Sequence, residues 1–243
     1  MRSESEELIV ALDVEDLQKA LRLVNLLKDQ VSLFKVGLQL YTAAGPEVVR
    51  EIQTRGGRVF LDLKLHDIPN TVARAVIQAG RLGVDMLTLH TLGGHQMLQQ
   101  AIERIRERSE AEGWPAPKLL GVTILTSLDA RALELIGIDR PLDEMVLLLA
   151  RTAQEAGLAG IVCSPHELKL LKTEGLTDLL FVIPGIRPSG SEKGDQARSM
   201  TPFEAISHGA GCIVVGRPIT EAADPVQAVQ AIVDEMARAR MRP

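Results

Sequence analysis

The sequence predicts an α/β fold, namely a single-domain (β/α)8 TIM barrel in which parallel strands alternate with covering helices. Three observations support this prediction. Eight short apolar runs are spaced along the 243 residues, helical patterns separate these runs, and no Ser/Gly-rich or Pro-rich linker divides the chain. We therefore expect one barrel domain over residues 1–243, of which residues 1–7 form a short polar N-terminal extension.

Each of the eight apolar runs has the length and composition of a buried strand. In chain order they are Leu8 to Val14, Leu33 to Val36, Val59 to Leu65, Met86 to His90, Leu119 to Leu125, Gly160 to Cys163, Leu180 to Ile183, and Cys212 to Val215. A barrel with eight strands is what this number of runs in a chain of this length favours.

Helical spacing of apolar residues is found between these runs. The sets that form one apolar face each are Leu17, Ala20, Leu21, Val24 and Leu27; Val48, Val49 and Ile52; Val72, Ala75, Val76 and Ala79; and Met97, Leu98, Ala101, Ile102 and Ile105. Thr201 to Glu204 is typical of a capping box with proline at the first helical position, and Asp224-Pro225 opens the last helix.

An open, doubly wound sheet is the alternative fold for alternating strands and helices. Such a sheet usually carries a glycine-rich turn after its first strand, where it binds a dinucleotide phosphate. The corresponding segment here, Val10 to Glu15, contains no glycine. The barrel is therefore preferred.

Composition and charge argue against nucleic-acid binding. The net charge is −5, aromatic residues make up 2% of the chain, and no basic stripe is present, so nucleic-acid binding has little support. An anionic small molecule remains possible, because local basic residues can outweigh a mildly acidic total.

No apolar run is long enough to span a membrane, and the polar, acidic start of the chain does not resemble a signal peptide. Two cysteines, Cys163 and Cys212, lie far apart inside apolar runs and lack metal-like spacing. Buried free thiols in a reducing cytoplasm are expected, with no membrane partner.

The segment Asp62 to Thr71 is the most informative part of the chain. Strand side chains alternate between two faces, so Asp62 and Lys64 are expected on the same face, roughly 7 Å apart. Asp67 then falls on a strand-to-helix loop, where catalytic groups concentrate in parallel α/β proteins. The array of Asp62, Lys64 and Asp67 is either a structural ion-pair network or a fixed electrostatic field for catalysis.

Polar residues stand at the ends of most other predicted strands, which is where a barrel holds its catalytic groups. Asp13 ends the first strand, Lys35 lies in the second, and Asp62 and Lys64 end the third. The later strand ends carry Thr126 and Ser127, Pro184 to Arg187, and Gly216 with Arg217. His66 and His90 are each compatible with a structural or a pocket-lining role. Four ionisable side chains are thus expected to converge at one mouth of the barrel. Because burying them is costly unless they pair or act on a ligand, a functional site is favoured over a structural network.

Together these segments resemble the orotidine 5′-phosphate decarboxylases of bacterial type. The residues that carry the resemblance are Lys35, Asp62 to Thr71, Thr123 to Ser127, Gly185 to Pro188, Gly194 to Gln196, and Val215 to Pro218. The resemblance runs in order from Leu8 to about Ile219. The Asp-x-Lys-x-x-Asp motif alone is shared by several phosphate-binding barrels. The full set of segments named above is specific to the orotidine 5′-phosphate decarboxylases.

The resemblance implies a role for each matching residue. Asp13 and Lys35 would contact the ribose and the charged network, and Asp62 and Lys64 would face the orotate carboxylate. Asp67, with Ile68 and Thr71, would enter the site from the partner subunit of a homodimer. Two hydroxyl residues would lie beside the pyrimidine, and five residues would line the loop and the phosphate. These two sets are Thr126 and Ser127, and Pro184, Arg187, Gln196, Gly216 and Arg217.

The implied activity is decarboxylation of orotidine 5′-phosphate to UMP, a step of pyrimidine biosynthesis. Loss of carbon dioxide from C6 leaves a carbanion that no carbonyl delocalises, so the protein must stabilise the charge directly. Lys64, held by Asp62 and Asp67, is expected to stabilise this carbanion and then to protonate it. The resemblance implies no cofactor and no metal, and a small-molecule nucleotide as the partner.

Two other functions remain open at this point. A metal-dependent sugar-phosphate decarboxylase or aldolase of the same barrel superfamily shares the Asp-x-Lys-x-x-Asp motif, but an acidic metal ligand would be expected where Lys35 stands. A catalytically inactive barrel kept as a binding protein is the second alternative, and the presence of every charged position speaks against it.

Overall fold

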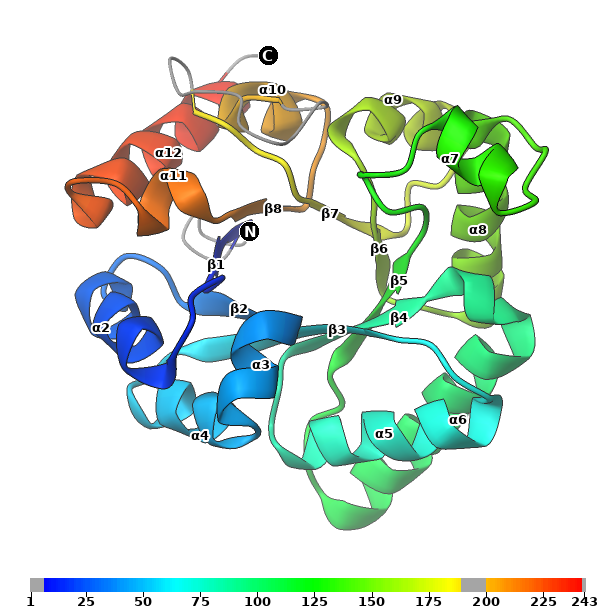
Figure 1. The fold of residues 1–243 in the computed structure, drawn as a ribbon, viewed down its shortest axis with the longest axis horizontal. Helices are drawn as coiled ribbons and strands as arrows, with labels where there is room; N and C mark the ends of the chain where they lie inside the picture. Colours follow the sequence, from blue (N-terminus) through cyan, green and yellow to red (C-terminus); the bar gives the residue numbers. More distant parts are fainter. Residues whose placement is uncertain (1–6, 189–199, 242–243) are drawn as a thin grey trace.

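The computed structural model describes residues 7–188 and 200–241 and confirms the predicted (β/α)8 barrel. The strands pair with their neighbours in chain order, all parallel, and β1 pairs with β8 to close the barrel. Figure 1 looks onto this arrangement, with the strands at the centre and the helices around them. The strands are β1 Leu8–Ala11, β2 Leu33–Gly37, β3 Arg58–Leu65, β4 Met86–His90, β5 Lys118–Val122, β6 Gly160–Val162, β7 Leu180–Ile183 and β8 Cys212–Val215.

Two strands end three residues before their predicted ends. β1 ends at Ala11 rather than Val14, and β5 ends at Val122 rather than Leu125. In both places the apolar run continues past the last paired residue because the loop that follows is itself buried: Leu12 and Ile124 are almost completely covered. Apolar character marks burial in general, so it cannot by itself separate the end of a strand from a buried loop.

Helices surround the barrel. They are α2 Leu17–Leu27, α3 Leu38–Ala44, α4 Glu47–Thr54, α5 Pro69–Arg81, the 3-10 helix η1 Thr91–Gly93, α6 Gly94–Glu112, α7 Ala130–Leu135, α8 Leu142–Ala156, α9 Pro165–Thr173, α10 Pro202–Ser207, α11 Arg217–Thr220 and α12 Pro225–Arg240. The predicted capping box at Thr201 and Glu204 and the cap at Asp224 are both present. α5 carries the predicted apolar face of Val72, Ala75, Val76 and Ala79 and begins at Pro69, where a proline is favourable because the first helical position needs no N–H.

The apolar interior consists of two separate clusters. The larger one lies between the strands and the helices and includes the predicted helix faces, such as Val48, Val49 and Ile52 of α4. The smaller one belongs to the strands alone and fills the inside of the barrel. Its buried members are Ile9, Ala11, Leu33, Phe60, Met86, Leu120, Val182, Cys212 and Val214. The inside of the barrel is therefore a packed layer, and functional groups must lie beyond its rim.

Strand β3 differs from the regular strand that the sequence predicts. Leu61 pairs with Leu87 of β4, but the next paired residue of β3 is Leu65, which pairs with Leu89, so the register shifts between them. Within this irregular stretch Lys64 has a φ of 51°, in the left-handed region. Strict alternation therefore does not explain how Asp62 and Lys64 come together; a bulge that re-aims the lysine does.

No helix within the described ranges is both long and apolar enough to cross a membrane. Cys163 and Cys212 are buried free thiols, as predicted. Except for Glu7, the predicted N-terminal extension lies outside the described residues.

Candidate active site

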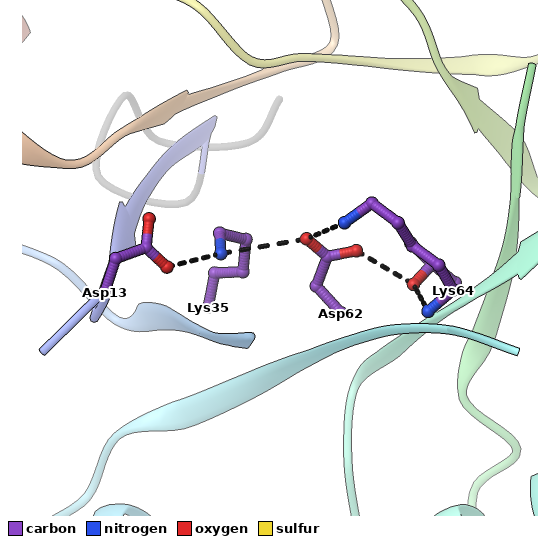
Figure 2. A network of polar contacts seen from close by, with 5 residues as sticks. Asp13, Lys35, Asp62 and Lys64 are labelled. Carbon is purple, nitrogen blue, oxygen red and sulfur yellow. Dashed lines mark hydrogen bonds and ion pairs between the residues drawn. The ribbon is translucent and has the colours of Figure 1, made fainter. Parts of the chain in front are cut away.

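A chain of alternating charges crosses the mouth of the barrel at the carboxyl ends of β1, β2 and β3. The Asp62 carboxylate lies at its centre: Oδ2 is 2.8 Å from the Lys64 Nζ and 3.7 Å from the Lys35 Nζ. Lys35 also donates a hydrogen bond of 2.9 Å to Asp13 Oδ1. Figure 2 shows the resulting order, Asp13, Lys35, Asp62, Lys64. The predicted convergence of these four side chains is thus observed.

The fold explains why these residues meet. Lys35 lies two residues after Leu33 on β2, and Asp62 lies two residues after Phe60 on β3, so both follow a member of the inner apolar layer on the same face. Leu12, just beyond β1, is held against β2 by a hydrogen bond from its N–H to the Lys35 carbonyl. Asp13 therefore leaves β1 beside Lys35.

Exposure separates the members of this network. The side chains of Lys35 and Asp62 are 11% and 12% exposed, whereas that of Lys64 is 29% exposed. Two buried, paired charges therefore support a third that a ligand can reach. The partly exposed Lys64 side chain lines the cavity described below.

The electrostatic environment keeps Asp62 ionised. Burial by itself raises the pKa of Asp62, but the Lys35 and Lys64 ammonium groups and hydrogen bonds from Lys64 and Thr88 outweigh burial. The pKa of Asp62 consequently lies below its ordinary value. At neutral pH the site holds a carboxylate between two cations, which is a fixed, preorganised field.

Thr88 on β4 is a site residue that the sequence did not reveal. Its hydroxyl is completely buried and lies 2.9 Å from Asp62 Oδ1 and 2.9 Å from the Lys64 backbone nitrogen. Threonine is common in strands for reasons of packing alone, so its presence in an apolar run carried no signal. Only the structure shows that it touches both charged residues.

Two histidines lie next to the charged network. The rings of His66 and His90 are 5.5 Å apart, and His90 Nδ1 is buried without a hydrogen-bond partner among the described residues. Burial, together with His66 and Lys64, lowers the pKa of His90 against the opposing effect of Asp62. These effects favour the neutral form of the His90 ring.

A cavity of about 140 Å³ opens beside Lys64. Lys35, Asp62, Lys64 and Thr126 supply its polar groups. The remaining wall is apolar and consists of Phe60, Val122, Ile124, Leu125, Val162, Cys163, Pro184 and Val214. A flat, uncharged ring fits such a wall while a charged substituent faces the lysine and the aspartate.

A second cavity adjoins the first and shares Lys35, Pro184 and Val214 with it. Its additional lining includes Arg187, Arg217 and the glycines Gly185 and Gly216, together with Asp13 and Glu221. Two guanidinium groups at strand ends β7 and β8 provide positive charge and donors suited to a phosphate. The two cavities thus meet at Lys35, and their linings suit a ring in the first cavity and an anion in the second, the anion-binding cavity.

Several predicted site residues lie apart from this centre. Asp67 is on the predicted strand-to-helix loop, but it is exposed and its Oδ1 accepts a hydrogen bond from the Ile68 N–H. Ile68, Thr71 and Ser127 are exposed and line neither of the two cavities. Gln196 lies outside the described residues. One chain therefore does not bring Asp67, Ile68 or Thr71 to Lys64.

Across the two described ranges, no group of three His, Cys, Asp or Glu side chains is arranged to hold a metal ion.

Comparison with known proteins gives a consistent result. The model of the Orotidine 5′-phosphate decarboxylase / HUMPS family matches residues 6–232. The chain is 51% identical over 232 residues to an orotidine 5′-phosphate decarboxylase from Moorella thermoacetica, covering 95% of this chain and 92% of the relative. It is 53% identical over 234 residues to that of Syntrophotalea carbinolica, covering 96% of each. The crystal structure of the enzyme from Lactobacillus acidophilus is similar, with 40% identity, a TM-score of 0.82, and coverage of 95% of this chain and 99% of that one.

Proposed function

The chain belongs to the orotidine 5′-phosphate decarboxylase / HUMPS family, and on this premise we propose that it converts orotidine 5′-phosphate to UMP in pyrimidine biosynthesis. The geometry of Lys64 carries the proposal. Its ammonium is 2.8 Å from a buried carboxylate, and its side chain lines a cavity whose wall is apolar except for Lys35, Asp62, Lys64 and Thr126. This arrangement suits a neutral ring that develops negative charge on one atom.

The reaction follows from these groups. The bond between C6 and the carboxylate carbon breaks, carbon dioxide leaves, and the electron pair stays on C6. The Lys64 ammonium stabilises this carbanion and then transfers a proton to it, which gives UMP and leaves a neutral amine that regains a proton from solvent. Asp62 holds the ammonium in place by a hydrogen bond, and Lys35, which is paired with Asp62 and Asp13, supports that carboxylate.

The phosphate and the ring occupy the two cavities in this proposal. Arg187, Arg217 and the backbone at Gly216 bind the phosphate, and Lys35 and Asp13 contact the ribose between them. Thr126 and Ser127 lie beside the pyrimidine, and Thr126 lines the first cavity. Pro184, which lines both cavities, belongs to the loop and phosphate end, as does Gln196, which lies outside the described residues. Binding energy from the distant phosphate helps to hold C6 against Lys64.

We also propose that the active unit is a homodimer. Asp67, Ile68 and Thr71 are exposed, and the Ile68 side chain, 67% exposed, is a large apolar group at the mouth of the barrel. In the dimer these residues complete the partner's site, where Asp67 becomes the second carboxylate beside Lys64. Two buried free thiols agree with a cytoplasmic location.

The alternative functions fit the site less well. In a metal-dependent sugar-phosphate enzyme the position of Lys35 would be expected to hold an acidic ligand, but this lysine is buried and bridges Asp13 and Asp62. An inactive binding barrel would not need the buried Lys35 and Asp62, whose burial is costly without a function.

A direct assay tests the proposed activity. Purified protein in chelator should remove the absorbance of orotidine 5′-phosphate and form UMP at the rate measured without chelator. Activity that disappears in chelator and returns with Mg²⁺ would favour the sugar-phosphate enzymes instead. Orotidine without its phosphate serves as the control substrate and should react poorly.

Hybrid dimers test whether Asp67 acts across the interface. Lys64→Ala and Asp67→Ala proteins should each be nearly inactive, whereas a mixture unfolded and refolded together should recover about a quarter of wild-type activity. The recovery arises because about half of randomly paired dimers are hybrids, each with one site free of both substitutions. If Asp67 acted within its own chain, mixing would restore nothing.

A further inference from the structure

We propose that Thr88 is a positioning residue of this site: its hydroxyl orients the Asp62 carboxylate and holds the Lys64 backbone so that the ammonium faces the substrate. The inference rests on the proposed function and deepens it. Thr88 lies on β4, makes no direct contact with the cavity, and acts through the two charged residues beside it.

The two hydrogen bonds of Thr88 have a forced direction. A hydroxyl carries one hydrogen and two lone pairs, whereas the Lys64 backbone nitrogen can only donate. The hydroxyl must therefore accept from Lys64 N, at 2.9 Å, and its own hydrogen points to Asp62 Oδ1, also at 2.9 Å. The side chain is completely buried, so water does not compete for either bond.

Thr88 fixes the rotation of the Asp62 carboxylate. Both lysines approach the same oxygen, Oδ2, with Lys64 Nζ at 2.8 Å and Lys35 Nζ at 3.7 Å. Thr88 holds the other oxygen, Oδ1. Without that bond the carboxylate is free to turn, and the position of the Lys64 ammonium is less well defined.

Thr88 also supports an unusual backbone conformation. Lys64 has a φ of 51°, in the left-handed region that residues with a side chain rarely adopt. Leu61 and Leu65 pair with Leu87 and Leu89, so Thr88 stands opposite the bulge. Its side-chain oxygen accepts the Lys64 N–H where the regular ladder is interrupted. Valine has the same shape but offers no such acceptor.

Other charged or titratable groups around Asp62 must be considered when its protonation is measured. Lys35 approaches from β2, Lys64 from β3, and His90 from the end of β4, while Asp13 lies behind Lys35. A substitution at Thr88 removes none of these groups. A shift in the titration of Asp62 therefore follows from the missing hydroxyl, either directly or through the position of Lys64.

The test compares Thr88→Val and Thr88→Ala with Thr88→Ser. In the two variants without a hydroxyl, kcat should fall on the order of 10- to 100-fold, because a hydrogen bond to a charged group contributes an energy of this size. KM should change by less than about threefold. Thr88→Ser should stay within about threefold of wild type. Equal losses in the serine and valine variants would overturn the proposal.

A second readout does not depend on turnover. In protein with ¹³C-labelled aspartate, the Asp62 carboxyl signal, assigned with Asp62→Asn, should titrate at higher pH in Thr88→Val than in wild type or Thr88→Ser. An unchanged midpoint would overturn the role of Thr88 even in a protein that does not decarboxylate the substrate. Failure of the wild-type assay with a shifted midpoint would instead reject the proposed function alone.

Thr91→Val is the matched control. Thr91 is also buried, 1% exposed, and its hydroxyl donates only to the Val122 carbonyl, at 2.8 Å. This variant should lose a similar amount of thermal stability. It should leave the Asp62 midpoint unchanged and kcat within about threefold of wild type. A comparable shift of the midpoint in Thr91→Val would show that general loosening, rather than the Thr88 hydroxyl, causes the effect.

Discussion

The inner apolar layer and the charged network lie on the same face of the same strands, only two residues apart. On each of three neighbouring strands, one residue belongs to the apolar layer and the second residue after it belongs to the polar site. These pairs are Leu33 and Lys35, Phe60 and Asp62, and Met86 and Thr88. Residues that stabilise the fold and residues that form the candidate site are therefore only two positions apart on the same strand.

The two layers contribute to the folded structure in different ways. Burial of the apolar residues stabilises the fold because their surface leaves water, and a residue of similar volume can replace each of them. The polar layer is buried only because each charge has a partner, so its members depend on one another. A substitution in the inner apolar layer is therefore expected to lower the stability of the fold, and a substitution in the polar layer is expected to lower catalytic activity.

Lys64→Ala should give the largest effect. It removes stabilisation present mainly in the transition state, so kcat should fall by at least ~10³, while the melting temperature changes little. Steady-state kinetics and thermal unfolding measure the two quantities. Lys28→Ala, which alters an exposed lysine at the end of α2, is the control and should match wild type in both. A mild loss of kcat in Lys64→Ala would reject its assignment.

Leu33→Ala should show the opposite pattern. Leu33 is 1% exposed within the apolar layer, so its truncation should lower the free energy of unfolding by about 2–5 kcal/mol. Below the unfolding transition, kcat should stay close to wild type. Urea denaturation gives the stability change, and Lys35→Ala on the same strand provides the comparison. If Leu33→Ala reduced kcat as strongly as Lys35→Ala, the separation of the layers would be wrong.

Arg217→Ala should have a smaller and different effect on catalysis. Arg217 lines the anion-binding cavity, away from Lys64, so its removal should mainly raise KM. A decrease in kcat is expected only to the extent that phosphate binding also drives closure of the site. The control is orotidine without its phosphate, whose slow reaction should respond little to Arg217→Ala. An equal response with both substrates would contradict the phosphate assignment.

The smallest effect concerns acid stability. The pKa of His90 is lower in the folded protein than in the unfolded chain. As the pH falls through about 6.5, the histidine is therefore protonated in the unfolded chain before it is protonated in the folded protein. Stability linked to His90 is therefore present above that pH and is lost below it. Urea denaturation between pH 7 and 5 should show a shallower pH dependence for His90→Asn than for wild type. Parallel curves would exclude this linkage.

The strand order and the charged residues at the strand ends were predictable because both follow simple periodic rules. Apolar runs marked the strands, and Asp13, Lys35 and Asp62 were in phase with the apolar layer. The bulge at Lys64 was not predictable, because a left-handed lysine has no sequence signal of its own. The proposed role of Asp67 came from resemblance alone and depends on a second chain.

Helix α3 and residue Thr88 show the other limit of the sequence. Helix α3 starts after Gly37, which has no side chain to cap it, so no helix start was visible. Thr88 becomes important only through a register shift between β3 and β4. Features that depend on long-range pairing cannot be deduced from local spacing.

Closure of the barrel has a consequence for the synthesis of this protein. Leu8 pairs with Ile213, so the first strand made by the ribosome must wait for the last before it has both neighbours. At about 5–20 residues per second, this delay is on the order of 10 to 40 s. Throughout it the nascent chain carries an unpaired, entirely apolar strand edge, which is a template for association with other chains. The pairing that leaves the finished barrel without an open edge is also the last to form, so the risk of aggregation falls mainly on the nascent chain.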